Sequence, residues 1–459
     1  MKRTLAEVAR ATFGKLVGRD APFLGVSSDS RTLEAGALFV ALRGPNFDGG
    51  EFVAAAAARG AAGALVMRAA GTEPAQVVVP DTLAALQELA SAWRQDFSIP
   101  VVAVAGSNGK TTTKEMIASI LSRRGACLST RGNLNNHIGV PLTLLRLEAT
   151  HRSAVIEMGA NRIGDVAGIV QWVRPTVAVV TNAGAEHLEG FGDLDGVARG
   201  EGEAFGTLGA QGVAVINADD AYAGFWRDLA RASRVLTFGA ERPADFGARE
   251  VRQGIEQGRF VTRFELVSPQ GNCKVCLHAG GSHNLLNALA AAATATAAGA
   301  TLADVAAGLD EFRAVAGRLQ LKAGLRNSWI IDDSYNANPS SVRAGLDVLR
   351  SVGGATWLVL GDMAELGEHA VQSHVQIGRY ARECGVQRLF AIGPESSRAA
   401  EAFGQGAEWF PDAESLIRRL TAEVASGITL LIKGSRVNRL ERVVQALAGQ
   451  SVKASGGEH

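Results

Sequence analysis

The chain has 459 residues, of which 47% are hydrophobic and 20% charged, and this length predicts about two to four domains. Lys plus Arg and Asp plus Glu both number 46, so no net charge attracts nucleic acid or an anionic membrane. No apolar stretch reaches about 18 residues, and the four cysteines are typical of a reducing compartment. We therefore expect a cytoplasmic protein that neither inserts into a membrane nor binds nucleic acid.

The first section, residues 1–82, is predicted to be a small α/β domain. Residues 1–8 begin with charge but lack a continuous apolar run, which favours an amphipathic helix over a signal peptide. Strand-like pieces at 37–42 and 63–67 alternate with Ala-rich helical stretches. Such alternation is typical of strands packed against helices.

The second section, residues 83–314, predicts a doubly wound parallel sheet. Residues 101–105 are fully apolar and suit a buried parallel strand. A helix is expected from 110 to 124, where Gly125 can end it. Helical segments separate most of the further strands, which are expected at 154–156, 176–180 and 213–216. The Ala-rich stretch 287–300 is expected to be a packed helix.

The third section, residues 315–459, repeats this alternation. Strands are predicted at 329–331, 357–360, 388–392 and 429–432, and residues 454–459 are predicted to be a frayed tail. The predicted fold is α/β with three domains: a small N-terminal α/β domain, a central P-loop-type domain with a mainly parallel sheet, and a C-terminal Rossmann-like domain.

Cys273 and Cys276 form a C-x-x-C pair, which can indicate metal or redox chemistry. No second pair or suitably spaced histidine completes a zinc site, and the flanking residues resemble a strand. We expect a structural strand here.

Polar residues lie at the carboxyl ends of the predicted strands in the last two sections. In open α/β sheets this edge is where ligands bind, so we expect two such edges to meet at a cleft between domains. The residues are Glu157, Asn182, Asp332, Asp333, Asp362 and Lys433.

The segment between the strand at 101–105 and the following helix predicts a phosphate-binding loop. Gly106 and Gly109 allow positive φ, so that backbone N–H groups can converge on an anion, and the helix start adds its own N–H groups. Lys110 can reach the β- and γ-phosphates, and the Thr111 hydroxyl can bind Mg²⁺. The spacing is shorter than the usual loop, which would require glycine at Val104. The predicted nucleotide contacts are Gly106, Ser107, Asn108, Gly109, Lys110, Thr111 and Thr112.

This short loop resembles the ATP loop of the Mur ligases, the amide-forming enzymes of peptidoglycan precursor assembly. Other segments extend the resemblance in the same order along almost the whole chain. They lie at 28–31, 130–136, 157–161, 282–287, 332–339, 360–367 and 433–436.

The resemblance implies a reaction in which ATP activates a carboxylate as an acyl phosphate, which an amine then attacks. The last three segments resemble the family member that joins D-Ala-D-Ala to UDP-N-acetylmuramoyl-tripeptide. The Asp-Asn-Pro-Arg signature of the ligase that adds the third peptide residue is absent. The resemblance further implies a UDP-sugar-binding domain at 1–82, an ATP-binding domain at 83–314, a dipeptide-binding domain that closes over the nucleotide at 315–459, and a monomer.

The resemblance also implies two Mg²⁺ ions. Lys110 would hold phosphates, Thr111 and Glu157 would bind one ion, and His187 would bind the second. Related ligases have a carbamylated lysine where Glu201 stands in this chain. Our hypothesis is that Glu201 supplies the second-metal carboxylate directly, so that activity needs no bicarbonate. A slipped alignment, with Glu201 or Glu203 as surface charge, remains the alternative.

Further contacts follow from the same resemblance. Arg318 would reach the phosphates when the domains close, Asn287 would lie beside the adenine, and Asp333 would contact the ribose. Asn336 and Asn338 would lie on the nucleotide side. The expected substrate contacts are Ser28, Asp29, Ser30 and Arg31 for the uridine diphosphate, Asn133, Asn135 and Asn136 for the muramoyl peptide, and Asp362, Lys433 and Arg436 for the dipeptide.

Two kinds of alternative remain open at this stage. One is another ligase of the same superfamily, either the third-residue-adding or the folate polyglutamate type. The other is a P-loop regulatory NTPase, because phosphate loops serve many reactions; the neutral charge balance and the acidic strand ends argue against it.

Overall fold

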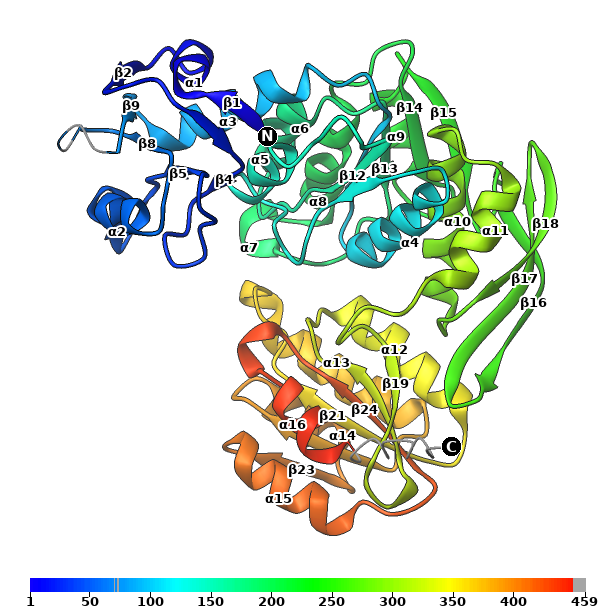
Figure 1. Cartoon of the computed structure of the whole chain (residues 1–459). Coiled ribbons are helices and arrows are strands. Elements are labelled where there is room, and N and C mark those ends of the chain that lie inside the picture. The colour runs from blue at the N-terminus through cyan, green and yellow to red at the C-terminus, as the bar shows by residue number, and fades with distance from the viewer. Residues whose placement is uncertain (70, 72–73, 449–459) are drawn as a thin grey trace, which may run out of the picture.

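The computed structural model describes residues 1–69, 71 and 74–448, so the tail predicted at 454–459 lies outside the described residues. Figure 1 shows a small N-terminal part beside the central sheet, with the last sheet below the central one. The predicted three-part α/β fold is confirmed. No helix among the described residues is long and apolar enough to cross a membrane.

The N-terminal part contains a five-stranded sheet and two small two-stranded pairings. Residues 1–8 are not one helix as expected. Lys2–Thr4 is strand β1, which pairs antiparallel with β3 (Pro22–Leu24), and helix α1 (Leu5–Ala11) begins only afterwards. Thr4 ends the strand because it caps the helix: its hydroxyl accepts from Glu7 N, and the Glu7 carboxylate accepts from Thr4 N.

The five-stranded sheet has the order β2-β9-β8-β5-β4. The strands predicted at 37–42 and 63–67 are β5 and β8. The bounds are Lys15–Val17 (β2), Val26–Ser27 (β4), Leu38–Val40 (β5), Gly63–Val66 (β8) and Gln76–Val78 (β9), with Arg43–Gly44 (β6) pairing Phe47–Asp48 (β7), the 3-10 helix Gly49–Phe52 (η1) and the helix Val53–Ala58 (α2).

The central sheet is entirely parallel, with the order β11-β12-β10-β13-β14-β15. Alternate residues of β10 (Val101–Ala105) enter different cores: Val102 packs with helices on one face, and Val101 and Ala103 with those on the other. The predicted doubly wound sheet is therefore confirmed. The other strands are Cys127–Ser129 (β11), Ser153–Glu157 (β12), Val177–Val180 (β13), Val213–Asn217 (β14) and Arg234–Phe238 (β15).

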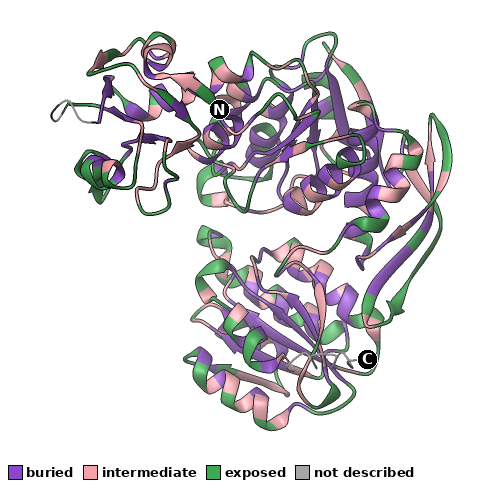
Figure 2. Ribbon diagram, viewed as in Figure 1, coloured by how far each residue is buried: buried purple, intermediate pink, exposed green. Residues whose placement is uncertain are grey.

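Helices cover both faces of this sheet (Figure 2), whose strands are almost wholly buried. One face holds α4 (Lys110–Ser122), α10 (Ser282–Ala297) and α11 (Leu302–Glu311). The other holds α3 (Thr82–Arg94), α5 (Gly139–Leu144), α6 (Asp165–Val173) and α8 (Leu194–Gly202). Shorter helices are α7 (Leu188–Phe191), η2 (Glu203–Phe205) and α9 (Ala223–Leu229).

A three-stranded antiparallel sheet, β16-β17-β18, was not predicted from the sequence. Strand β16 (Gly247–Glu256) is largely exposed, so it has no alternation of apolar and polar residues to reveal it. Strand β17 (Arg259–Ser268) places Phe260 in the core of the last section. Strand β18 (Gly271–Leu277) contains both C-x-x-C cysteines, which are free, so the expected strand is confirmed.

The last sheet has the order β19-β20-β24-β21-β22-β23, in which only β19 (Gln320–Ala323) is antiparallel to its neighbour. Its remaining strands are Trp329–Asp333 (β20), Ala355–Gly361 (β21), Arg388–Ile392 (β22), Ala407–Phe410 (β23) and Ile428–Lys433 (β24). The helices are Leu325–Asn327 (η3), Pro339–Val352 (α12), Gly367–His369 (η4), Ala370–Glu383 (α13), Ser396–Phe403 (α14), Ala413–Glu423 (α15), Arg436–Asn438 (η5) and Glu441–Leu447 (α16).

Candidate functional site

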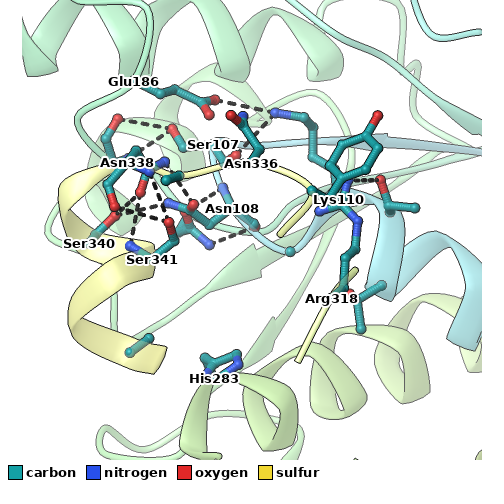
Figure 3. A pocket seen from close by; sticks show the side chains of 18 of the residues that line it. Ser107, Asn108, Lys110, Glu186, His283, Arg318, Asn336, Asn338, Ser340 and Ser341 are labelled. Carbon is teal, nitrogen blue, oxygen red and sulfur yellow. Dashed lines mark hydrogen bonds and ion pairs between the residues drawn. The ribbon is translucent and has the colours of Figure 1, made fainter. Parts of the chain in front are cut away.

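A cavity of about 670 Å³ lies where the carboxyl edge of the central sheet meets that of the last sheet. The phosphate loop, Glu157 at the end of β12 and His187 after β13 line one side, and Arg318, Asp333 and α12 residues line the other. Figure 3 shows Asn338, Ser340 and Ser341 facing Asn108, while Glu186 extends toward Lys110. The strand-end residues Glu157, Asn182, Asp333 and Lys433 line this cavity, whereas the predicted residues Asp332 and Asp362 do not.

The phosphate loop needs glycine at two positions. Gly106 has φ +119°, and a Cβ there would lie 2.2 Å from Thr181 Oγ1. Gly109 has φ +82°, and a Cβ there would lie 2.2 Å from Asn287 Oδ1. The left-handed conformation and the close approach both exclude a larger residue. Helix α4 then begins at Lys110, as predicted, although it ends at Ser122 rather than 124.

Asn182 holds the turn of the phosphate loop. Its Oδ1 accepts from Asn108 N at 3.0 Å, and its Nδ2 donates to Asn108 O at 2.9 Å. The Thr181 hydroxyl also donates to Asn108 O, at 2.6 Å. The loop backbone is thus fixed by the residues that follow β13, which leaves the Asn108 side chain free to contact the last section.

Lys110 lies among three carboxylates. Its Nζ donates to Glu186 Oε1 and to Ser107 O, both at 3.2 Å. Burial opposes the lysine charge, but Glu186, Glu201 and Glu157 together raise the Lys110 pKa. Burial raises the pKa of Glu186 to about 7, against the opposing effect of Lys110. Three carboxyl groups around one ammonium form a site at which bound cations would stabilise the ionised carboxylates.

Glu157 has the environment of a metal ligand. Its side chain is buried, Oε1 accepts from Asn135 Nδ2 at 2.9 Å, and Oε2 is buried without a hydrogen-bond partner. An unpaired buried carboxylate oxygen is costly unless a cation binds it. Carboxylate and hydroxyl oxygens are the ligands that Mg²⁺ prefers, so Glu157 and the nearby Thr111 fit such an ion.

His187 comes immediately before α7 and has φ +48°. Its ring lines the cavity, and Nδ1 lies 2.7 Å from Glu365 Oε2 of the last section. Burial lowers the His187 pKa, which favours the neutral ring that a metal ligand requires. Glu365 lies in the segment 360–367, but its place beside His187 could not be predicted from that segment.

Glu201 lies beneath the phosphate loop rather than in the cavity lining. It is fully buried on α8, its Oε2 accepts from Gly106 N at 2.6 Å, and its Oε1 has no partner. Burial raises the Glu201 pKa, whereas Lys110 and the Gly106 hydrogen bond lower it. The surface-charge alternative does not fit this burial. A metal contact of Glu201 stays a prediction; the contact that the structure gives it is to the loop backbone.

Substitutions of Glu201 separate these two roles. Glu201→Gln keeps an oxygen acceptor for Gly106 N, so we expect nucleotide affinity within about threefold of the native value. Glu201→Ala leaves a buried N–H without an acceptor at a cost of about 1–3 kcal/mol, so we expect affinity to fall about tenfold. Calorimetric titration with a non-hydrolysable ATP analogue measures both.

If Glu201→Gln and Glu201→Ala lose the same nucleotide affinity, the result would favour a role that depends on the charge of the carboxylate. Removing bicarbonate should leave native turnover unchanged in either case. A bicarbonate requirement in the native protein would contradict our hypothesis for Glu201.

Residues of the last section reach the phosphate loop directly. The Arg318 guanidinium donates to Thr111 Oγ1 at 2.9 Å and stacks over the Tyr335 ring at 4.3 Å. Asn338 Nδ2 donates to Asn108 Oδ1 at 2.8 Å, and Asn108 Nδ2 donates to Ser340 Oγ at 3.1 Å. These contacts close the last sheet against the central one.

Lys433 is less available for substrate than its predicted role requires. Its Nζ donates to Asp333 Oδ2 at 2.6 Å and to Asn336 O at 2.9 Å, and its side chain is only 3% exposed. Asp333 Oδ1 also accepts from Leu319 N. Lys433 therefore fixes Asp333 at the cavity wall, and its contact with a dipeptide carboxylate stays a prediction.

The other predicted substrate residues separate into two groups. Asn133, Asn135 and Asn136 line the cavity, as does the predicted adenine contact Asn287. Asp362 instead accepts from the backbone N and the hydroxyl of Ser396. Outside the cavity lining are Asp362, Arg436 and the segment Ser28, Asp29, Ser30 and Arg31.

In the 28–31 segment, the exposed Arg31 guanidinium binds the Asp29 carboxylate and lowers its pKa to about 2. Arg436 is largely exposed and lies 3.4 Å from Glu441. The Arg31 guanidinium therefore lies at the surface. Arg436 is not in the cavity lining, but its guanidinium lies 5.9 Å from the centre of the Tyr335 ring, which lines the cavity. The substrate roles of both arginines stay predictions.

Several cavity residues were not assigned a role from the sequence. Glu186 is the most important of them, and its position directly before His187 at a strand end was a usable signal. Tyr335 lies within the segment 332–339 and Ser340 directly follows it, but only other residues of this segment were predicted to contact the nucleotide. His283 lines the cavity as well, and burial lowers its pKa.

Three family models match consecutive parts of the chain. They are the Mur ligase family catalytic domain at 23–123, the Mur ligase middle domain at 104–295, and the Mur ligase glutamate ligase domain at 317–436. The UDP-N-acetylmuramoyl-tripeptide–D-alanyl-D-alanine ligase of Escherichia coli K12 is 43% identical over 97% of this chain and 98% of its own length. The chain belongs to the Mur ligase family.

Solved structures support this membership. MurF from Acinetobacter baumannii matches with a TM-score of 0.90 and 36% identity over 97% of this chain and 98% of its own. MurF from Thermotoga maritima in complex with ADP matches with a TM-score of 0.82 and 28% identity, over 92% of this chain and 96% of its own. A folylpolyglutamate synthase from Mycobacterium tuberculosis, at 18% identity and a TM-score of 0.62, shares the fold only.

Proposed function

We propose that the chain is an ATP-dependent amide ligase that joins D-alanyl-D-alanine to UDP-N-acetylmuramoyl-tripeptide in peptidoglycan precursor synthesis, as a cytoplasmic monomer. The observation that supports this most is the cavity in which the phosphate loop of the central sheet meets Arg318 and Asn338 of the last sheet. The name of the Escherichia coli relative supplies the two substrates.

The three sections take separate roles in this proposal. Residues 1–82 bind the uridine diphosphate part, with Ser28, Asp29, Ser30 and Arg31 as its contacts. Residues 83–314 bind ATP and Mg²⁺. Residues 315–459 bind the dipeptide and close over the nucleotide; Asp362, Lys433 and Arg436 are the proposed dipeptide-side residues.

The reaction has two steps. A carboxylate oxygen of the tripeptide attacks the γ-phosphorus of ATP, and the bond to the bridging oxygen breaks, so that ADP leaves with the electron pair. The dipeptide amine then attacks the acyl carbon, phosphate leaves with the electrons of the C–O bond, and the nitrogen loses a proton. Both steps bring negative groups together, so catalysis depends on compensating positive charge.

The chain supplies that charge from two sides. Lys110 lies at the loop and neutralises the β- and γ-phosphates, while Arg318 approaches from the last section. Thr111 and Glu157 would hold one Mg²⁺, and His187, with Glu201 nearby, would serve the second. Bound Mg²⁺ would neutralise phosphate oxygens and orient them. In the structure the Lys110 ammonium donates to Glu186. Bound nucleotide would take the place of Glu186 as its partner.

A phosphate-release assay tests the function. With ATP and Mg²⁺, the purified chain should release phosphate only when both UDP-muramoyl-tripeptide and D-Ala-D-Ala are present, and mass spectrometry should find the joined product. Stimulation by folate plus glutamate, or release without any acceptor, would contradict the proposal. Parallel assays with diaminopimelate- and lysine-containing tripeptides show which third residue is accepted.

A further inference from the structure

The loop after β21, residues 362–367, brings a carboxylate from the last section to the central one. Glu365 Oε2 lies 2.7 Å from Nδ1 of His187, whose ring lines the cavity. The loop approaches α7 closely, because a Cβ on Gly367 would lie 3.0 Å from Glu189 Cγ. The loop therefore rests on the short helix that His187 begins.

The last section itself determines where this loop lies. Three successive backbone N–H groups donate to its side chains: Asp362 N to Asn438 Oδ1, Met363 N to His374 Nε2, and Ala364 N to Ser435 Oγ. These acceptors belong to or adjoin η5 and α13, and His374 is fully buried. The backbone before Glu365 is consequently fixed to the body of the last section.

Glu365 then has φ +63°, a left-handed conformation that non-glycine residues adopt infrequently. Such a conformation persists only where the surrounding structure enforces it, and it occurs often at functional sites. Here it directs the side chain to His187 of the central section. The position of the carboxylate thus depends on how the last section is docked.

The contact determines what His187 can do. With Nδ1 beside a carboxylate, the proton is favoured on Nδ1, and Nε2 on the other side of the ring is the nitrogen left to bind a ligand. Metal-binding histidines commonly have their second nitrogen on a carboxylate, which fixes both the tautomer and the ring orientation. Lys110 and Glu186 line the same cavity as His187.

We propose that Glu365 is a positioning residue that orients the His187 ring from the last section, so that the ion site at His187 is complete only in the closed molecule. The inference rests on the proposed function, since it deepens the metal role given to His187 there. Docking of the dipeptide-binding section would then complete the ion site beside the bound ATP.

Kinetics on five variants test the proposal. Glu365→Ala should lower kcat by about 10–100-fold with the KM for ATP nearly unchanged, because loss of a metal-orienting partner has effects of this size. Glu365→Gln keeps an oxygen beside Nδ1 and should recover part of the loss. Glu368→Gln, in η4 directly after the loop, is the matched control and should behave as the native protein.

The double variant His187→Ala with Glu365→Ala shows whether the glutamate acts through the histidine. It should be no slower than His187→Ala alone; multiplied losses would overturn the proposal. Mn²⁺ binding, followed by electron paramagnetic resonance with a non-hydrolysable ATP analogue, gives a readout besides activity. Glu365→Ala should weaken the weaker Mn²⁺ site by about 10–100-fold, and unchanged Mn²⁺ affinity would also overturn it. If the native protein lacked ligase activity but showed this Mn²⁺ coupling, the proposed function would fail while the positioning role stood.

Discussion

Lys110→Met is expected to lower kcat/KM by about 10³-fold or more, because removing one preorganised charge donor from an active site has effects of this order. The Lys110 ammonium already lies at the loop, 3.2 Å from Glu186 and from the Ser107 carbonyl oxygen. Methionine has a similar volume but no charge. The phosphates of ATP would then face Glu157 and Glu186 without the ammonium between them, so both nucleotide affinity and turnover should fall.

The fold should tolerate this change. Burial already raises the Glu186 pKa to about 7, and losing Lys110 removes the main effect that lowers it, so the carboxyl becomes mostly protonated, and therefore neutral, at neutral pH. Arg123→Met, at the exposed end of α4 where Arg123 pairs with exposed Glu311, is the control. Phosphate release and thermal melting measure the two effects. A loss of less than about tenfold with normal melting would contradict the role of Lys110.

Arg318→Ala is expected to lower kcat by about 10²- to 10³-fold while changing nucleotide affinity less than about threefold. Arg318 belongs to the last section, yet its guanidinium donates to Thr111 Oγ1 at the start of α4. It also stacks on Tyr335, which fixes the direction of the side chain. A charge that arrives with the closing section acts mainly after ATP is bound, so its loss should affect the chemical step.

Single-turnover phosphate release and equilibrium binding of an ATP analogue separate the two effects. Arg318→Lys should recover only part of the rate, because lysine lacks the planar group that stacks on Tyr335. Arg313→Ala is the control, since Arg313 lies on the same connecting segment but donates only to nearby carbonyl oxygens. Equal losses in affinity and in rate would show that Arg318 binds the ground state as strongly as the transition state.

The repeating elements of both large sheets could be predicted from local patterns. Buried parallel strands are continuous apolar runs, and β10, β13 and β14 have that form. Strand β16 could not be predicted, because most of its residues face solvent and show no periodic pattern. The helix expected at residues 1–8 was wrong in its first half, since strand pairing with β3 is a contact between distant residues.

The candidate site was predictable to a similar extent. The phosphate loop is recognisable because its chemistry requires glycine, lysine and threonine at fixed short spacing, and the structure places this loop in the cavity. The strand-end rule likewise predicted Glu157, Asp333 and Lys433 at the cavity. The same rule misplaced Asp332 and Asp362. Asp332 accepts from Lys322 and Ser334, and the Asp362 carboxylate accepts from Ser396, the first residue of α14.

The sequence by itself therefore determined the α/β architecture, the family and the nucleotide loop, because each depends on residues close together along the chain. Only the tertiary structure decided which side chains pair. It placed Glu186 on Lys110, Glu201 under Gly106 and Glu365 beside His187. The physical reason is that burial and charged neighbours arise only when segments distant in sequence pack together. Burial and these neighbours set the pKa of Glu186 and Glu201 and determine which oxygen is left for a metal ion.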